Sequence, residues 1–135
     1  DFLLENSKIS RVGVGSAAQD VLNHISFTGG AYGKVTHSDG SANDGIVGTG
    51  DELTIYDKNG GEMARYTFVI YGDVNGDGAV TSMDLLYVKR HILGTKLLEE
   101  PYLTAADANR GNDGITSIDL LYIKRHILDI RYIEQ

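Results

Sequence analysis

The first half of the chain carries alternating apolar and polar positions that favour β-structure. Residues 52–56 and 63–71 alternate with a period of two, as half-buried strands do. Lys58-Asn59-Gly60-Gly61 lies between them, and Asn and Gly tolerate the positive φ angles of a tight hairpin turn. The inward faces are predicted to carry Leu53, Ile55, Ala64, Tyr66, Phe68 and Ile70. The pattern therefore predicts a β-hairpin ending near Tyr71.

Weaker patterns precede this hairpin. Residues 8–14 and 32–37 are each typical of a strand, and residues 38–50 are rich in Gly, Asp, Asn and Ser, which favours a loop. Between the two strands, Ser16 followed by Gln19 predicts a capping box and a helix start. Val21, Leu22 and Ile25 give this helix one apolar face, and it is expected to end between Ser26 and Gly30.

After Tyr71 the chain contains one unit twice. Residues 73–84 and 107–119 are two loops rich in Asp, Asn and Gly, and each is followed by nearly the same helical sequence, residues 85–93 and residues 120–128. The repeat period from Asp84 to Asp119 is 35 residues. Residues 97–106 between the units predict a short connecting helix or turn around Pro101.

These patterns predict an α+β protein of two parts. Residues 1–71 are expected to form a small β-rich module with one helix, and residues 72–135 an all-α module of two loop–helix repeats plus a connecting helix. No linker separates the strand pattern from the first loop at Tyr71-Gly72. We therefore expect the two modules to pack together as one rigid unit.

Composition excludes several classes of function. A net charge of −7 argues against binding nucleic acid by neutralising its phosphates. The 135 residues include no cysteine, so neither disulfides nor a thiolate metal site is expected. No apolar run reaches the length of a membrane span. The chain starts at Asp1 without a signal-peptide pattern, which suggests an excerpt of a longer protein or a mature form.

The first loop matches the spacing of an EF-hand calcium loop. Such a loop places oxygen ligands at positions 1, 3, 5, 7, 9 and 12, with Gly at position 6. Here these positions hold Asp73, Asn75, Asp77, the Ala79 carbonyl, Thr81 and Asp84, with Gly78 at the bend and the apolar Val80 at position 8. The loop departs from an EF-hand because position 12 is Asp and a strand pattern precedes the loop. The alternative is an Asx-rich turn that only caps the helix.

The second loop has one residue more. If Asp119 is position 12, Ile115 matches Val80, but Asp107 lies one residue too far upstream. The loop therefore has an insertion between Asn109 and Asp113. The predicted ligands are Asp107, Asn109, Asp113 and Asp119, so we expect two calcium ions in all. Missing entering helices argue against a calcium sensor and favour a structural ion.

Both helices are expected to have two apolar faces. Leu85, Val88, Ile92 and Leu93, with Leu120, Ile123, Ile127 and Leu128, have the spacing of core residues. The opposite faces are expected to present Met83, Leu86, Tyr87 and Arg90, then Ile118, Leu121, Tyr122 and Arg125. So small a domain cannot bury all these faces, which indicates a protein-binding surface. Contact with the β-rich module is the alternative.

Together these motifs resemble the type I dockerin family. The resemblance is carried by Asp73-Val-Asn-Gly-Asp-Gly78, Ser82-Met83, Asp84-Leu85, Lys89-Arg90 and the duplicate that begins at Asp107, and it covers residues 72 to about 130. It implies a three-helix module with two calcium-bound repeats that binds a cohesin domain. Such modules attach enzymes to a scaffoldin or another secreted protein of anaerobic bacteria, as in a cellulosome.

The resemblance also implies which residues contact the partner. The family's recognition positions correspond to Ser82, Met83, Lys89, Arg90, Ser117, Ile118, Lys124 and Arg125. Residues 1–71 loosely resemble the X modules found before dockerins, which implies support of the dockerin fold or additional partner contact. Because the two helices repeat the same surface, a pseudo-two-fold axis would allow the partner to bind in either orientation. A secreted protein that is monomeric when unbound is expected.

The remaining sequence features give weaker indications of function. His91 and His126 lack the second ligand of a zinc site and are interpreted as helix-surface or interface residues. Tyr32, Tyr56 and Tyr66 favour core packing over a sugar-stacking platform. A carbohydrate-binding first module tethered by the dockerin nevertheless remains the alternative function. No nucleophile or acid–base pair indicates catalysis.

Overall fold

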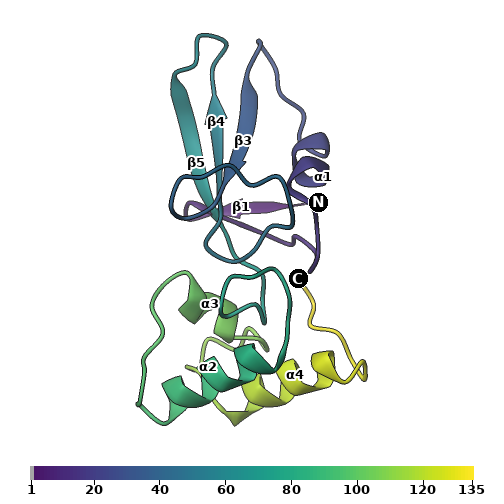
Figure 1. Ribbon diagram of the computed structural model, residues 1–135, viewed down its shortest axis with the longest axis vertical. Helices are drawn as coiled ribbons and strands as arrows, with labels where there is room; N and C mark the ends of the chain where they lie inside the picture. The colour runs from purple at the N-terminus through teal and green to yellow at the C-terminus, as the bar shows by residue number, and fades with distance from the viewer. Residues whose placement is uncertain (1) are drawn as a thin grey trace.

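The computed structural model describes residues 2–135 and contains one mixed sheet and four helices (Figure 1). The strands are β1 (Leu3–Glu5), β2 (Lys8–Ser10), β3 (Tyr32–Thr36), β4 (Glu52–Tyr56) and β5 (Glu62–Phe68). Their order in the sheet is β1-β2-β5-β4-β3. Only the β2–β5 pair is parallel. The predicted hairpin is confirmed as β4 and β5, with Asp57 and Gly61 pairing across its turn.

The first helix begins later than predicted. Helix α1 (Ala18–Asn23) has Ala17 at its N-cap, and no side chain caps it. The predicted capping box is wrong because the Ser16 hydroxyl donates instead to the Gly13 carbonyl oxygen, 2.7 Å away. The helix also ends at Asn23, before the predicted stretch. Strand β1, which the sequence did not predict, lies at the sheet edge beside β2.

Two hydrophobic clusters form, one in each half of the chain. The first contains Ile9, Val12, Val21, Leu53 and Phe68, which the sheet and α1 bring together. The second contains Val74, Val88, Ala106, Ile123 and Ile133. Each half of the chain thus has a core of its own, as a domain requires.

The second half is built from α2 (Ser82–Ile92), α3 (Tyr102–Ala106) and α4 (Ser117–Ile127). Helices α2 and α4 pack against each other below the sheet, and α3 lies between them and the sheet (Figure 1). Each long helix begins with the same capping box. In α2 the Thr81 hydroxyl accepts from Met83 N–H, and the Asp84 carboxylate accepts from Thr81 N–H. These reciprocal bonds satisfy amide groups that a helix start leaves unpaired.

The predicted core positions are confirmed for Leu85, Val88, Leu120, Ile123 and Ile127, which are buried in the second cluster or packed against it, and wrong for Ile92, Leu93 and Leu128. Val88 and Ile123 are fully buried. Ile92 is 41% exposed, Leu93 75% and Leu128 57%. Ile92 is the last residue of α2, and Leu93 and Leu128 are the C-cap residues of α2 and α4, so all three lie at helix ends that the core does not cover.

The two halves are in close contact at the first Asp-rich loop. Residues 46–50, which we call the support loop, lie against residues 73–78. The Thr49 amide donates to Asp73 Oδ2 at 2.9 Å, and the Thr49 hydroxyl bonds to both the amide and the carbonyl of Ile70. Lys8 also forms an ion pair with Glu100 at 2.8 Å. These contacts agree with the expected packing of the two parts against each other.

Within residues 2–135, none of the helices combines the length and apolar character needed to cross a membrane.

Candidate metal centre and docking face

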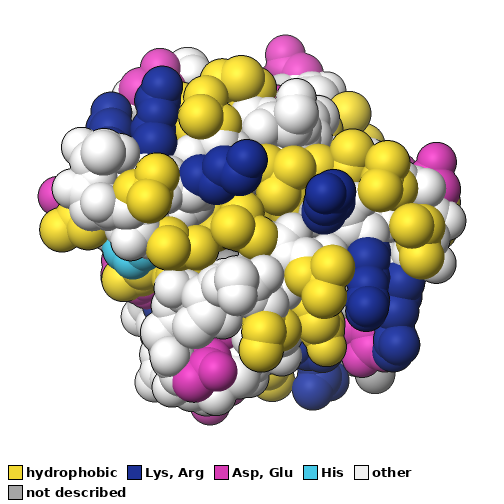
Figure 2. Space-filling view, turned by 90° about the horizontal axis from the view of Figure 1, so that it is seen from below, with side chains coloured by type: hydrophobic (Ala, Val, Ile, Leu, Met, Phe, Trp, Pro, Cys, Tyr) yellow, Lys and Arg dark blue, Asp and Glu magenta, His cyan; other side chains and the backbone are white. Residues whose placement is uncertain are grey.

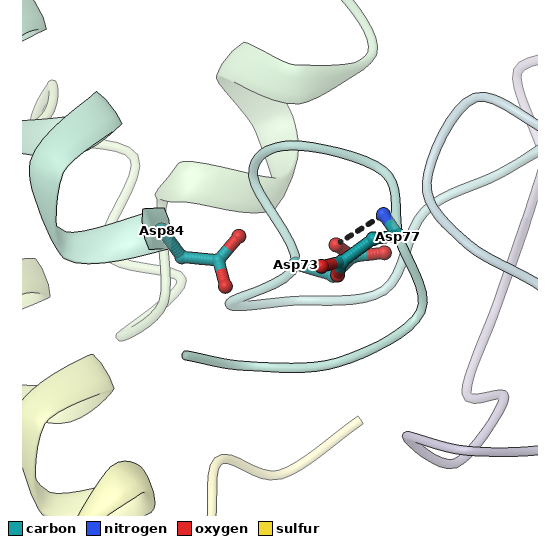
Figure 3. Close-up of side chains that lie close together, drawn as sticks. All are labelled: Asp73, Asp77 and Asp84. Carbon is teal, nitrogen blue, oxygen red and sulfur yellow. Dashed lines mark hydrogen bonds between the residues drawn. The ribbon is translucent and has the colours of Figure 1, made fainter. Parts of the chain in front are cut away.

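Three carboxylates of the first loop converge. Oxygen atoms of Asp73, Asp77 and Asp84 all lie within 4.8 Å of one another (Figure 3). Asp73 and Asp77 come from the loop, and Asp84 reaches in from the first turn of α2. Gly76 and Gly78 have φ angles of 81° and 83°, which allow the chain to bend around this centre.

Backbone amides fix the orientation of these carboxylates. Asp73 Oδ1 accepts from Gly76 and Asp77 N–H, and its Oδ2 accepts from Gly78 and Thr49 N–H, all within 3.1 Å. Asp84 Oδ1 accepts from the amides of residues 74 and 75. The loop therefore holds its acidic groups in place through its own backbone.

The negative charge of this cluster favours binding of a cation. Asp73 and Asp84 are fully buried, and among residues 2–135 neither forms an ion pair with Lys, Arg or His. Burial raises the pKa of Asp73 to about 7, although its amide hydrogen bonds act in the opposite direction. Burial raises the pKa of Asp84 as well. Buried carboxylates without a partner are costly, and an all-oxygen ligand set suits a hard divalent cation.

The remaining predicted ligands of this loop lie beside the carboxylates. Asn75 Oδ1 accepts from Asp77 N–H at 3.2 Å, and Asn75 Nδ2 lies 3.3 Å from Asp77 Oδ2. The Ala79 amide donates to Asp77 Oδ1 at 3.0 Å. Asn75 and Asp77 are thus part of one hydrogen-bonded turn, and Ala79 follows it directly.

The second loop reproduces part of this arrangement. Asp119 is fully buried and accepts from Asn109 and Thr116 N–H, as Asp84 does from its own loop and N-cap. Asp107 accepts from the amides of residues 111 and 112. Among residues 2–135, however, no second set of three acidic groups converges as closely as in the first loop.

The inserted residue changes the backbone path of this loop. Arg110, Asn112 and Gly114 have positive φ angles of 53°, 53° and 81°, where the first loop uses only Gly76 and Gly78. Asp113 lies exposed on this longer path. The extra residue thus has a visible structural effect.

Apolar side chains gather on the underside of α2 and α4, with Lys and Arg among them (Figure 2). Two pairs of apolar residues at equivalent positions of the helices are similarly open to solvent. Met83 is 46% exposed and Ile118 47%, while Leu86 is 37% exposed and Leu121 42%. Ser82, Lys89, Arg90, Ser117, Tyr122 and Lys124 are also exposed, and Tyr87 and Arg125 are half-buried. We call these twelve residues the docking face.

The equivalence extends to the segments that follow the helices. Leu98 N–H donates to His91 Nδ1 at 2.9 Å, and Ile133 N–H donates to His126 Nδ1 at 3.1 Å. Each histidine thus holds the chain segment that returns past its helix. The sequence had shown the two histidines at repeated positions but not this role.

A pocket lies beside each helix at equivalent places. The larger, of about 430 Å³, is lined by residues that include Tyr87, Arg90 and Leu98. The smaller, of about 150 Å³, is lined by residues that include Tyr122, Arg125 and Ile133. The pseudo-symmetry of the two repeats therefore includes the hollows at the edges of the docking face.

Comparison with known proteins decides the family. Residues 71–128 match the profile of the Dockerin type I domain. Two solved relatives are variants of the ScaB dockerin from Acetivibrio cellulolyticus, each described in complex with the third cohesin of ScaC, with mutations in the N-terminal and the C-terminal helix, respectively. The first is 31% identical, and the match covers 49% of this chain and 92% of the relative, with a TM-score of 0.45. The second is 33% identical, with 48% and 90% covered and a TM-score of 0.44. The chain belongs to the type I dockerin family.

Dockerin domains are non-catalytic docking modules of extracellular cellulosome complexes, and this assignment agrees with the lack of a catalytic motif in the sequence. The dockerin match begins at residue 71, next to the predicted boundary at residues 71 and 72. No curated protein matches the chain. The resemblance of residues 1–71 to X modules stays a prediction.

Proposed function

We propose that residues 72–135 bind a cohesin domain through the docking face and so anchor a secreted protein in a multi-protein complex. The observation that carries this proposal is that α2 and α4 each expose apolar residues at equivalent positions, Met83 and Leu86 on one and Ile118 and Leu121 on the other, with Lys and Arg beside them (Figure 2). The two solved dockerins that resemble this domain are both described in complex with a cohesin. An enzyme or scaffold protein of an anaerobic bacterium, outside the cell, would be the anchored component.

The contact residues are proposed in two equivalent sets. On α2 they are Ser82, Met83, Leu86, Tyr87, Lys89 and Arg90, and on α4 they are Ser117, Ile118, Leu121, Tyr122, Lys124 and Arg125. Their exposed apolar groups supply the area that a protein interface buries, and the basic groups at the rim orient the partner. The carbohydrate-binding alternative gains no support from the comparisons, since both relatives are docking domains.

Two calcium ions are proposed to organise this face. In the first loop Asp73, Asn75, Asp77, Asp84 and the Ala79 carbonyl would hold the ion. In the second loop the ligands would be Asp107, Asn109, Asp113 and Asp119. Each ion neutralises carboxylates at the start of α2 or α4, so calcium binding stabilises the helix that carries half of the docking face.

Residues 1–71 are proposed to form a separate module that supports the dockerin. Its own hydrophobic cluster and its contacts with the first loop favour this division at residues 71 and 72. We expect the unbound protein to be monomeric.

The repeated face also supports binding in two orientations. Rotation by about a half-turn would exchange Met83 and Arg90 with Ile118 and Arg125. Replacing either pair with Ala should leave cohesin affinity within about threefold of the parent, and replacing all four should abolish it. Calorimetric titration with a cohesin measures this. If one pair alone abolished binding, only one orientation would be used, and if the fourfold variant bound normally, the docking face would be wrongly placed.

A further inference from the structure

The first dockerin loop is supported from outside the dockerin. One of the four amides that bond to Asp73 belongs to Thr49, which lies 24 residues upstream in the β-rich half. Thr49 is itself only 2% exposed, and its hydroxyl bridges the amide and carbonyl of Ile70, three residues before Asp73. A single residue therefore holds both the entry to the loop and its first acidic ligand.

The support loop is in turn fixed to the sheet. Asp51, the residue directly before β4, accepts from Gly48 N–H at 2.9 Å and from Asn43 Nδ2 at 2.8 Å. Gly50 N–H donates to the carbonyl of Phe68, the last residue of β5. The position of Thr49 is thus set by two central strands of the sheet.

Backbone lies directly on backbone at this contact. A Cβ atom on Gly48 would lie 2.2 Å from the Gly76 carbonyl oxygen and 2.9 Å from Gly78 N. A Cβ atom on Gly76 would lie 2.6 Å from the Thr49 carbonyl oxygen. No side chain fits between the support loop and the first loop, so a displacement of one loop displaces the other.

The second loop lacks such support in the described residues. The amides that bond to Asp107 come from residues 111 and 112 of the same loop. A Cβ atom on Gly114, whose φ angle of 81° is close to the 83° of Gly78, would meet nothing within 4 Å. The β-rich half thus covers one side of the first dockerin loop, whereas residues 110–114 of the second loop are exposed.

We propose that the support loop is a positioning element for calcium in the first loop. It holds Asp73 and the Gly76–Gly78 backbone in the ligand geometry before the ion arrives, so the first loop binds calcium more tightly than the second. This inference rests on the proposed calcium binding of both loops. Hydrogen-bonding partners of metal ligands commonly contribute about 10- to 100-fold to metal affinity, which sets the expected difference between the two loops.

The coupling is reciprocal. If the support loop raises the calcium affinity of the first loop, calcium in that loop must stabilise the support loop by the same factor. The Thr49 amide should therefore exchange with solvent about 10- to 100-fold more slowly in calcium than in chelator.

Gly48→Ala and Gly45→Ala in the full 135-residue chain provide a matched test. At Gly45 the nearest atom to a new Cβ is 3.9 Å away, so an alanine fits there. Gly48→Ala, by contrast, must displace the first loop. NMR signals of the Gly78 and Gly114 amides, followed during calcium titration, report the two loops separately. In the parent, Gly78 should reach its midpoint at a calcium concentration at least about tenfold below that of Gly114.

Gly48→Ala should raise the Gly78 midpoint by about tenfold or more and leave the Gly114 midpoint within about twofold. Gly45→Ala should change neither. Equal midpoints in the parent, or an unchanged Gly78 midpoint in Gly48→Ala, would overturn the inference. If neither glycine signal responded to calcium in the parent, the proposed calcium binding itself would fail, which is a distinguishable result.

Thr49→Val keeps the test decisive if Gly48→Ala does not fold. This variant removes only the hydroxyl that bridges Ile70 and retains the amide that bonds to Asp73. The Gly78 midpoint should rise about threefold or more, because both hydrogen bonds between the hydroxyl and Ile70 are lost, with Gly114 unchanged. Parallel shifts of both midpoints would indicate general destabilisation and contradict the positioning role.

Discussion

His126 Nδ1 accepts the backbone N–H of Ile133 at 3.1 Å, and this bond joins the C-terminal segment to the last turn of α4. Ile133 is only 7% exposed and belongs to the core shared with Val88 and Ile123. The histidine thus helps to place a core residue that lies outside any helix. His91 and Leu98 repeat the relationship after α2.

The His126 bond predicts a pH effect on stability. Burial disfavours the charged form of His126 and so lowers its pKa, while the negative charge of Asp129 acts in the opposite direction. The unfolded chain then takes up a proton near pH 6.5 that the folded protein resists. The stabilising effect is present above that pH and decreases as the pH falls through this window.

His126→Leu should lower the free energy of unfolding by about 1 kcal/mol at pH 7.5, and His126→Gln, which retains an acceptor oxygen, by less. Both variants should show a smaller loss of stability than the parent between pH 7.5 and 5.5. Thermal unfolding in saturating calcium measures this. An unaltered pH dependence in both variants would rule out the histidine contribution.

When calcium is removed, we expect Asp73 to give the opposite pH dependence of stability. Burial raises its pKa to about 7, so the folded, calcium-free protein favours the protonated form. The associated stability is complete below the unfolded pKa of about 4 and is lost as the pH rises through about 7. In chelator, the parent should therefore lose stability between about pH 6 and pH 8, and Asp73→Asn, which has no carboxyl group to ionise in this range, should lose less.

Bound calcium should remove this loss of stability. With calcium bound, the parent at pH 8 should be more stable than Asp73→Asn, because the ionised carboxylate then has a cation as its partner. Chemical unfolding at both pH values, with and without calcium, checks the prediction. Equal stabilities of the two proteins in all four conditions would show that Asp73 does not act as a buried ligand.

Comparing Gly78→Ala with Gly114→Ala measures how much the contact between the two halves contributes to the free energy of unfolding. Both glycines have φ angles near 80°, so each substitution carries the strain of a left-handed residue, about 1–2 kcal/mol. Only at Gly78 does the new Cβ meet the support loop, 2.6 Å from an Ile46 methyl group and 2.8 Å from the Val47 carbonyl oxygen. Gly78→Ala should thus cost about 1–3 kcal/mol more. Similar costs for the two variants in denaturant unfolding would mean that the contact is easily displaced.

The repeated half of the fold could be predicted because its determinants are local. Asp84 and Asp119 each lie three residues after a Thr that caps the helix, so helix start, loop end and acidic ligand follow from a few neighbouring residues. The position of Val88 and Ile123 in the core follows from helical spacing. The same spacing failed at Leu93 and Leu128, because these C-cap residues lie at helix ends that no other element covers, and spacing along one helix does not show where its neighbours end.

The first half was predicted less completely because its contacts are distant in sequence. Ser16 has the spacing of an N-cap, but its hydroxyl bonds to Gly13. Gly48-Thr49-Gly50 reads as an ordinary loop, and only the folded chain shows that it lies against residues 73–78. The sequence does contain one indication of this contact. Several glycines lie in each of the two segments, and glycine allows two backbones to approach each other closely.

Titration of the full chain against a panel of cohesin domains, in calcium and in excess chelator, tests the central claim most directly. Binding to at least one cohesin in calcium is expected, with loss of that binding in chelator, because the docking face depends on helices that the loops organise. Far-ultraviolet circular dichroism recorded alongside should show helix content falling in chelator. Equal cohesin binding and helix content in both conditions would contradict the account.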